Sequence, residues 1–196
     1  MNFLAHEYLS KDYKGVRVGN FLGDFIRRIE PGKYSEQVLI GIELHKKIDQ
    51  FTDSHPLVHE SKIMLHPRQG KYSSVLLDIY YDYFLAKNWD KFSDVPLNDF
   101  ATSVYDDFWE MRDVFPEKVV KFLPNMREQN WFYNYRSYFG IDKALQSIAR
   151  RAKYSNTIKN SLKDLQDLEV ELEEKFMLFF PELVAMSNEF LAKHNL

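Results

Sequence analysis

The sequence predicts an all-α fold that forms a single helical domain over residues 1–196. Apolar residues recur at helical spacing between the prolines and glycines, and no segment alternates convincingly with a period of two. Seven Gly and seven Pro are also few for a loop-rich β protein of this length. With 45% hydrophobic residues, the chain can bury one sizeable core.

The first half of the chain is expected to form five helices, spanning residues 2–10, 18–29, 35–53, 56–65 and 72–89. Prolines and glycines separate several of them. Ser35 is a typical N-cap for the third helix, and Pro56 suits the first turn of the fourth. The fifth is apolar nearly all round, which is typical of a buried helix.

The second half is expected to form helices over residues 97–114, 117–122, 137–151, 156–161 and 163–192. Pro96 suits the first turn of the first of these. Pro181 lies inside the last one and is expected to bend or break it, because proline removes a backbone donor. The stretch 124–140 is the most irregular, but its aromatic residues predict that it packs onto the core.

Composition excludes several classes of protein. Cysteine is absent, so disulfides, thiol catalysis and cysteine-ligated metals are excluded. The net charge of −3 argues against a general nucleic-acid-binding protein. The N-terminus does not resemble a signal peptide, and the apolar windows are too short to span a bilayer. We therefore expect a cytoplasmic protein that binds neither nucleic acid nor membrane.

Aromatic residues make up 16% of the chain. They indicate either an aromatic-rich helical core or, for some of them, a pocket for an elongated ligand. Helical periodicity alone does not separate these two interpretations.

Polar residues on apolar helix faces carry the functional signal. His45 and Asp49 lie one turn apart on the apolar face of the helix over 35–53, and a buried carboxylate needs a partner. Asp78 and Asp82 lie one turn apart on the buried helix over 72–89, where two carboxylates must share a cation or a proton. A simple His–Asp pair or a buried Arg would also satisfy these groups.

Two further residues have the same character. Asp24 follows Gly23 within an apolar segment, and His6 lies within Phe3-Leu4-Ala5-His6. Gly19 and Gly23 are one turn apart, a spacing that lets another backbone approach closely. Mixed His and carboxylate ligands suit Mn²⁺, Fe²⁺, Mg²⁺ or Zn²⁺, so these six polar residues together predict a metal site.

The same residues lie in motifs that resemble one known family. The motifs are Asn2-Phe3-Leu4-Ala5-His6, the segments 19–25 and 41–49 followed by Thr52-Asp53, and the segment 78–85 followed by Trp89. Together they resemble the acyl carrier protein phosphodiesterase family, also called holo-acyl-carrier-protein hydrolase. The resemblance implies a helical fold remotely related to HD-type metal phosphohydrolases, although this chain has no adjacent His-Asp pair.

The resemblance also implies an activity. Family members split the phosphodiester that joins 4′-phosphopantetheine to a serine of holo-acyl carrier protein, and they use Mn²⁺, with Mg²⁺ or Fe²⁺ as alternatives. The expected metal ligands are His6, Asp24, His45, Asp78 and Asp82. Asp49 is expected to be a partner of His45 or the catalytic base, and Lys46 is a possible phosphate contact.

An acidic carrier protein is expected to dock on basic residues. The candidate clusters are Arg27 with Arg28 and Arg150 with Arg151, although each also fits an ordinary solvated surface. Two other functions stay open. One is a metal phosphohydrolase that acts on a nucleotide or another small phosphoester, and the other is a non-catalytic helical module that binds a carrier protein.

Overall fold

The computed structural model describes residues 1–30, 32–151 and 157–196, and in these parts of the chain it contains helices and no strand. The all-α prediction is therefore confirmed. Short 3₁₀ turns, called η, connect several of the helices. The α-helices are α1 (Phe3–Leu9), α2 (Lys14–Gly23), α3 (Glu36–Ser54), α4 (Pro56–Gln69), α5 (Ser73–Lys87), α6 (Leu97–Glu110), α7 (Glu117–Val120), α8 (Leu123–Glu128), α9 (Trp131–Asn134), α10 (Tyr138–Arg151) and α11 (Ser161–Lys193).

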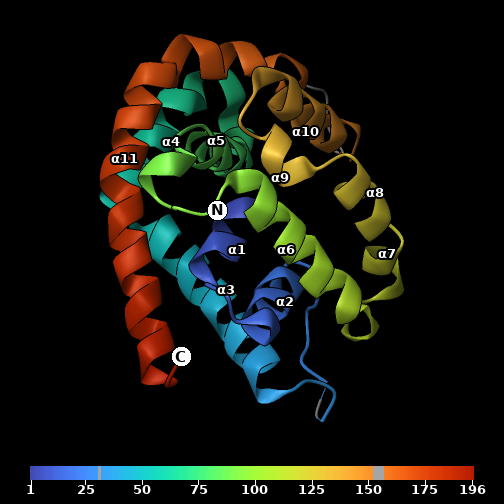
Figure 1. The fold of residues 1–196 in the computed structure, drawn as a ribbon. Coiled ribbons are helices and arrows are strands. Elements are labelled where there is room, and N and C mark those ends of the chain that lie inside the picture. The colour runs from blue at the N-terminus through green and yellow to red at the C-terminus, as the bar shows by residue number, and fades with distance from the viewer. Residues whose placement is uncertain (31, 152–156) are drawn as a thin grey trace.

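The helices pack around one aromatic-rich core. The long helix α11 runs along one edge of the molecule and packs against α3, α4 and α5 (Figure 1). Helix α1 lies in the centre, between α2 and α5, and the short helices α7 to α9 lead along the opposite edge into α10. The central position of α1 brings the N-terminal motif of the sequence into the middle of the fold.

Helices α2 and α3 approach each other at glycines. A Cβ atom on Gly19 would lie 2.0 Å from the carbonyl oxygen of Val38, and one on Gly41 would lie 2.2 Å from that of Val16. Neither distance is sterically possible, so these two glycines permit the close contact between the helices. The close backbone approach expected at Gly19 is confirmed, and it sets α2 and α3 at the spacing that the site requires.

Helix boundaries were partly predicted. Ser35 caps α3 by accepting from the backbone N–H of Val38 at 3.5 Å, and Pro56 is in the first turn of α4, as expected. The helix expected over 18–29 instead spans Lys14–Gly23. It ends at Gly23, and the ring of Phe25 packs on Phe3 and Phe122, with centroid distances of 6.1 and 5.6 Å.

Two prolines lie inside helices that continue through them. Of the bend or break expected at Pro181, the break does not occur, because α11 runs from Ser161 to Lys193 with Pro181 inside it. Phe179, Phe180 and Leu183 are buried on both sides of this proline, and their packing holds the helix together despite the lost backbone bond. Likewise, α4 passes Pro67 and ends at Gln69, four residues later than expected.

Candidate metal centre

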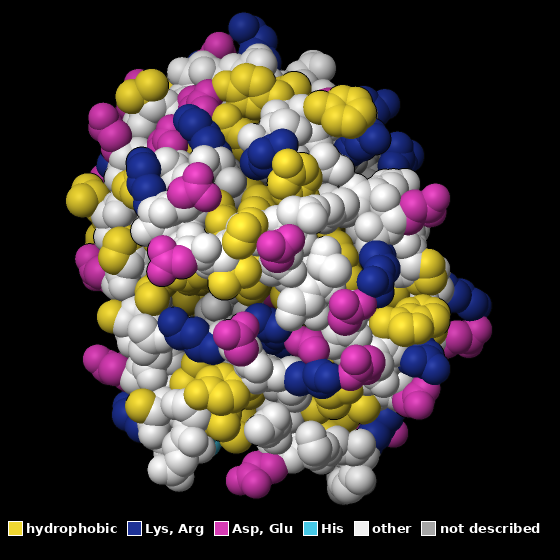
Figure 2. Space-filling model, viewed as in Figure 1, with side chains coloured by type: hydrophobic (Ala, Val, Ile, Leu, Met, Phe, Trp, Pro, Cys, Tyr) yellow, Lys and Arg dark blue, Asp and Glu magenta, His cyan; other side chains and the backbone are white. Residues whose placement is uncertain are grey.

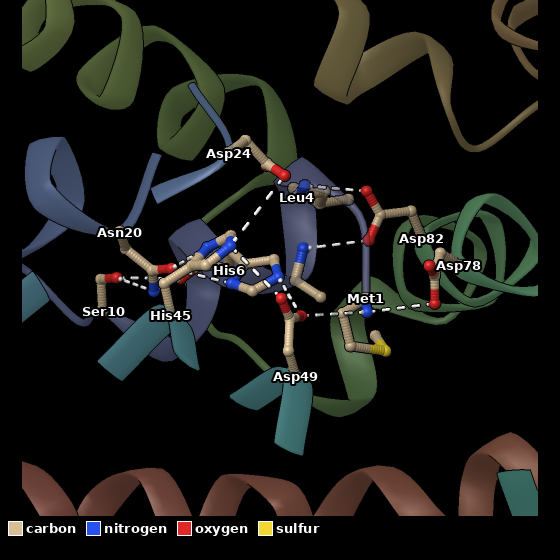
Figure 3. A network of polar contacts seen from close by, with 11 residues as sticks. Met1, Leu4, His6, Ser10, Asn20, Asp24, His45, Asp49, Asp78 and Asp82 are labelled. Carbon is tan, nitrogen blue, oxygen red and sulfur yellow. Dashed lines mark hydrogen bonds and ion pairs between the residues drawn. The ribbon is translucent and has the colours of Figure 1, made fainter. Parts of the chain in front are cut away.

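Three helices bring together a cluster of polar side chains. His6 comes from α1, Asn20 from α2, and His45 and Asp49 from α3 (Figure 3). The imidazole rings of His6 and His45 stack with their centroids 4.4 Å apart. Both side chains are buried, at 2% and 9% exposure. Neither α1 nor α3 could form this pair alone, so the cluster depends on the packing of the three helices.

Asn20 orients both rings. Its amide nitrogen Nδ2 lies 2.9 Å from the backbone carbonyl oxygen of His6 and 2.9 Å from Ser10 Oγ. A carbonyl oxygen only accepts, so this end of the amide must be the donor. The amide oxygen Oδ1 therefore faces the two rings, at 2.7 Å from Nδ1 of His6 and 3.2 Å from Nδ1 of His45.

This contact fixes the tautomer of both histidines. Because Asn20 Oδ1 is an acceptor only, each Nδ1 must carry a proton and donate it. In a neutral imidazole the other nitrogen, Nε2, then has a free lone pair. Histidines that bind metals are commonly held in this way by a group behind the ring.

Both Nε2 atoms face the same carboxylate. Nε2 of His6 lies 3.3 Å from Asp49 Oδ1, and Nε2 of His45 lies 3.3 Å from Asp49 Oδ2. Nε2 of His6 is buried and has no hydrogen-bond partner among the described residues. Two lone pairs and a carboxylate repel one another unless a proton or a cation lies between them. Ligand atoms of these three residues lie within 4.8 Å of one another, a spacing that a single metal ion could bridge.

The electrostatics of the cluster disfavour an ordinary His–Asp ion pair at His45. Burial, together with the neighbouring His6, lowers the pKa of His45 to about 4, so its imidazole is neutral at neutral pH. Burial by itself would raise the pKa of Asp49, but the interactions with His6, the terminal ammonium and His45 together outweigh it and bring this pKa down to about 2. A neutral imidazole beside an ionised carboxylate is the protonation state that a divalent metal needs.

The carboxylate side of the cluster is open to solvent. The side chain of Asp49 is 45% exposed and that of Asp24 is 42% exposed, whereas both histidines are buried. Asp24 Oδ1 lies 3.9 Å from Nε2 of His45. The expectation that Asp24 is buried is wrong, because α2 ends at Gly23 and Asp24 lies at the rim. The cluster is therefore accessible to solvent from this side.

Asp82 has a different role from the one expected for it. Its two carboxylate oxygens accept from the backbone N–H groups of Leu4, at 2.8 Å, and Ala5, at 3.1 Å. These are two of the four N–H groups that the first turn of a helix leaves without a partner. Asp82 therefore caps α1 from α5. It is fully buried, and burial raises its pKa to about 7 although the two N–H donors act in the opposite direction.

Asp78 lies one turn before Asp82 on α5 and contacts the start of the chain (Figure 3). Its Oδ1 is 3.1 Å from the terminal ammonium of Met1, which is also 3.7 Å from Asp49 Oδ1. The repulsion expected between Asp78 and Asp82 is thus relieved separately for each, by an ammonium group and by backbone donors. Neither carboxylate belongs to the three-residue cluster formed by His6, His45 and Asp49.

Gly23 makes room for His45. A Cβ atom on Gly23 would lie 2.4 Å from Cγ and 2.6 Å from Cδ2 of the imidazole ring. The spacing of Gly19 and Gly23 thus has two consequences. Gly19 admits the backbone of α3, and Gly23 admits the ring of a cluster residue.

The predicted cationic residues lie at the surface. Lys46 follows His45 directly, and its exposed side chain is on another face of α3, so the structure does not bring it into the cluster. Arg27 and Arg28 are exposed after the end of α2, and Arg150 is exposed on α10. The side chain of Arg151 lies outside the described residues.

Asn20 is the cluster residue that was missing from the expected site. It occurs in the motif of residues 19–25, but an Asn on an apolar helix face carries no chemical signal of its own. Its contacts with His6 and Ser10 span the loop between α1 and α2. Only the packing of these two helices reveals them.

The fold and the cluster define an all-α protein with a two-histidine, one-carboxylate constellation at the junction of three helices, open on its carboxylate side. The family model for acyl carrier protein phosphodiesterase matches residues 1–183. The chain therefore belongs to this family, and the resemblance of its motifs is confirmed.

Similar proteins cover nearly the whole chain. The acyl carrier protein phosphodiesterase of Photorhabdus laumondii is 29% identical over 187 residues, which cover 94% of this chain and 93% of that protein. The proteins of the same name from Yersinia enterocolitica and Escherichia coli O157:H7 are each 28% identical and cover 96% of this chain and 98% of their own. No solved structure matches the chain significantly. None of the described helices is long and apolar enough to cross a membrane.

Proposed function

We propose that this protein hydrolyses the phosphodiester that joins 4′-phosphopantetheine to the serine of holo-acyl carrier protein, releasing the apo-protein and 4′-phosphopantetheine. Family membership supports the substrate, since the relatives carry the name acyl carrier protein phosphodiesterase. One structural observation supports the chemistry. Two imidazole Nε2 atoms and one carboxylate converge, and one of these nitrogens is buried without a hydrogen bond among the described residues.

The donor set fits a divalent metal. His6 and His45 would each supply Nε2, Asp49 would supply an oxygen, and the rim carboxylate of Asp24 is close enough to add another. Two imidazoles with carboxylates suit Mn²⁺ or Fe²⁺, and Mg²⁺ prefers sites richer in oxygen. We propose Mn²⁺ as the ion, in keeping with the expectation from the sequence.

A divalent ion at this site would neutralise the anionic phosphate oxygens and lower the pKa of water near the scissile bond. The residues of the chain would supply positioning. Asn20 keeps both Nε2 lone pairs directed at the site, and Asp49 holds the charge that attracts the cation. The exposed edge formed by Asp24 and Asp49 leaves room for the phosphodiester and for water.

The test is the intact mass of the carrier protein after incubation with the enzyme, with and without Mn²⁺. We expect loss of the whole phosphopantetheine group with Mn²⁺ and no loss after chelation. Asp49→Asn should abolish the loss, because it removes the anionic ligand. Asp53→Asn is the matched control: it lies one turn further along α3, is exposed, and among the described residues forms an ion pair only with Lys62, at 2.8 Å.

Other outcomes identify the alternatives. If holo-carrier protein keeps its mass in Mn²⁺-loaded enzyme but a nucleotide or another small phosphoester is hydrolysed, the protein is a phosphohydrolase of different specificity. If the protein binds no metal and hydrolyses neither, the cluster is structural and the protein is a binding module.

A further inference from the structure

A cavity of about 580 Å³ opens at the start of α1, the helix that carries His6 of the candidate metal centre. Its wall begins at Asn2 and Phe3 at the start of α1 and at Ile79 on α5, and it continues along α8, α9 and α10. Ile79 directly follows Asp78, which contacts Met1. The cavity therefore starts where the polar network of the site ends. Its volume lies within the range of about 300–1,000 Å³ that is usual for sites of small organic ligands.

The lining combines amide side chains with apolar ones. Asn125, Gln129 and Gln146 present amides from α8, the following turn and α10, while Phe3 and Trp131 present rings. Some of these amides already bond to each other. Gln129 Nε2 donates to Asn125 Oδ1 at 2.8 Å, and Trp131 Nε1 donates to Gln129 Oε1 at 3.3 Å. The amide nitrogen of Asn125 has no partner among the described residues.

Asn2 is the most informative residue of the lining. It occupies the N-cap position of α1, where an Asn side chain normally accepts from the second or third N–H of the helix. Here Asp82 takes both of these N–H groups, those of Leu4 and Ala5. The half-buried amide of Asn2 therefore makes no capping bond, and in the described parts of the chain it has no other hydrogen bond. It remains available to a ligand in the cavity.

Charged side chains on α10 also line the cavity, one of them acidic, that of Asp142. Lys143 and Arg150 on α10 both line it, and both are exposed. Figure 2 shows Lys and Arg side chains gathered over the α10 end of the molecule, at the upper right, whereas acidic and basic side chains alternate over the lower part of this face. The cavity thus runs from the polar network of the site to a basic part of the surface.

We propose that this cavity binds the pantetheine arm of the substrate, and this inference rests on the proposed function. The arm is an elongated chain in which two amides alternate with alkyl segments, and the lining offers both amides and apolar rings. Asn2, at the end nearest the metal centre, would bond to the amide closest to the phosphate. Trp131 and Phe3 would pack against the alkyl segments, and Lys143 and Arg150 would face the acidic carrier protein.

The test measures the affinity of free 4′-phosphopantetheine by calorimetry. Ala144→Phe places a ring in the half-buried cavity wall and should weaken binding at least tenfold. Asn2→Ala should weaken it several-fold at an unchanged Tm, because Asp82 keeps α1 capped. Ala192→Phe, a change of the same size on the exposed end of α11, should bind like the wild type. The Mn²⁺ affinity of Ala144→Phe reports whether the neighbouring site is intact.

The outcomes separate the two proposals when turnover of holo-carrier protein is measured on the same samples. If the wild type removes the group and Ala144→Phe binds 4′-phosphopantetheine as tightly as Ala192→Phe does, the cavity assignment is wrong and the activity stands. The opposite result is that the wild type leaves the carrier unchanged but binds 4′-phosphopantetheine, and that Ala144→Phe abolishes this binding. In that case the cavity assignment stands and the proposed reaction is wrong. If Ala144→Phe does not fold, Asn2→Ala takes its place in the test. The assignment is then overturned if Asn2→Ala binds 4′-phosphopantetheine as tightly as the wild type does.

Discussion

His6 and His45 come from different helices, yet both place Nδ1 within hydrogen-bonding distance of one oxygen atom, Asn20 Oδ1, at 2.7 and 3.2 Å. The shared acceptor turns both Nε2 lone pairs towards Asp49. A pair of histidines that merely filled the core would need no common tautomer. This relationship is the structural basis for the metal hypothesis and for the first prediction.

Asn20→Leu should lower the affinity for Mn²⁺ by about 10–100-fold, the usual effect of losing a group that orients a metal-binding histidine. Asn20→Asp keeps an acceptor for both Nδ1 atoms and should lose less affinity for Mn²⁺ than Asn20→Leu does. The measurement is a calorimetric titration of each metal-free protein with Mn²⁺. Equal affinities for the wild type and Asn20→Leu would show that the two rings need no acceptor behind them.

Gly23→Ala should reduce turnover more than it reduces stability. The new methyl group would lie 2.4 Å from His45 Cγ, so the ring must move away from the position in which Nε2 faces Asp49. Gly19→Ala is the contrasting variant, because its methyl group would meet the backbone of Val38 at 2.0 Å and should mainly destabilise the protein. Carrier mass assays and thermal melts of both variants test this. Unchanged turnover in Gly23→Ala would mean that the ring position does not matter.

Asp82→Ala should lower the free energy of unfolding by about 2–3 kcal/mol, because it leaves two N–H groups of α1 without partners. The loss should be the same in protein treated with a chelator, since the capping bonds need no metal. Asp90→Ala, an exposed carboxylate just beyond α5, serves as the control. A stability loss that occurs only with Mn²⁺ present would instead identify Asp82 as a ligand.

The pKa of His45, lowered to about 4 by burial and His6, predicts a pH effect on the metal-free protein. Between pH 4 and the usual histidine value of about 6.5, the unfolded state binds a proton that the folded state does not. The contribution of His45 to stability is therefore complete above pH 6.5 and decreases as the pH falls towards 4, by about 3 kcal/mol in total.

The raised pKa of Asp82 acts in the opposite direction over part of the same range, so the comparison must be between the wild type and His45→Gln. Denaturant unfolding of both proteins at several pH values gives the difference between their free energies of unfolding. We expect the stability of the wild type relative to His45→Gln to fall as the pH drops from 6.5 to 4. Parallel curves would show that His45 titrates normally.

Salt should weaken the docking of an acidic carrier protein. Arg150→Gln removes an exposed charge at the cavity and should raise the KM for holo-carrier protein several-fold at low ionic strength, with the difference disappearing at high salt. Lys163→Gln, an exposed charge on α11 that pairs with Asp167, is the comparison. If the KM of the wild type and of both variants does not change with salt concentration, electrostatic docking at this surface is excluded.

Local features of the fold were predictable because they depend on neighbouring residues. The helical spacing of apolar residues predicted the all-α class, and Ser35 and Pro56 predicted two helix starts. The pair His45 and Asp49 was also predictable, since residues four apart share a face of one helix. The early end of α2 was not, because apolar residues continue at helical spacing to Phe25 and Ile26 although the helix stops at Gly23.

The sequence by itself determined which residues are candidates for a metal site, namely the histidines and carboxylates on apolar faces. Tertiary structure alone decided how they divide their roles. Asp49 and Asp82 have the same side chain, but Asp49 contacts two imidazole rings and Asp82 accepts hydrogen bonds from two backbone N–H groups. Asn20 gained its role only when α2 packed between α1 and α3. Hydrogen bonds are short and directional, so the partner of a buried polar group depends on helix packing that no single helix encodes.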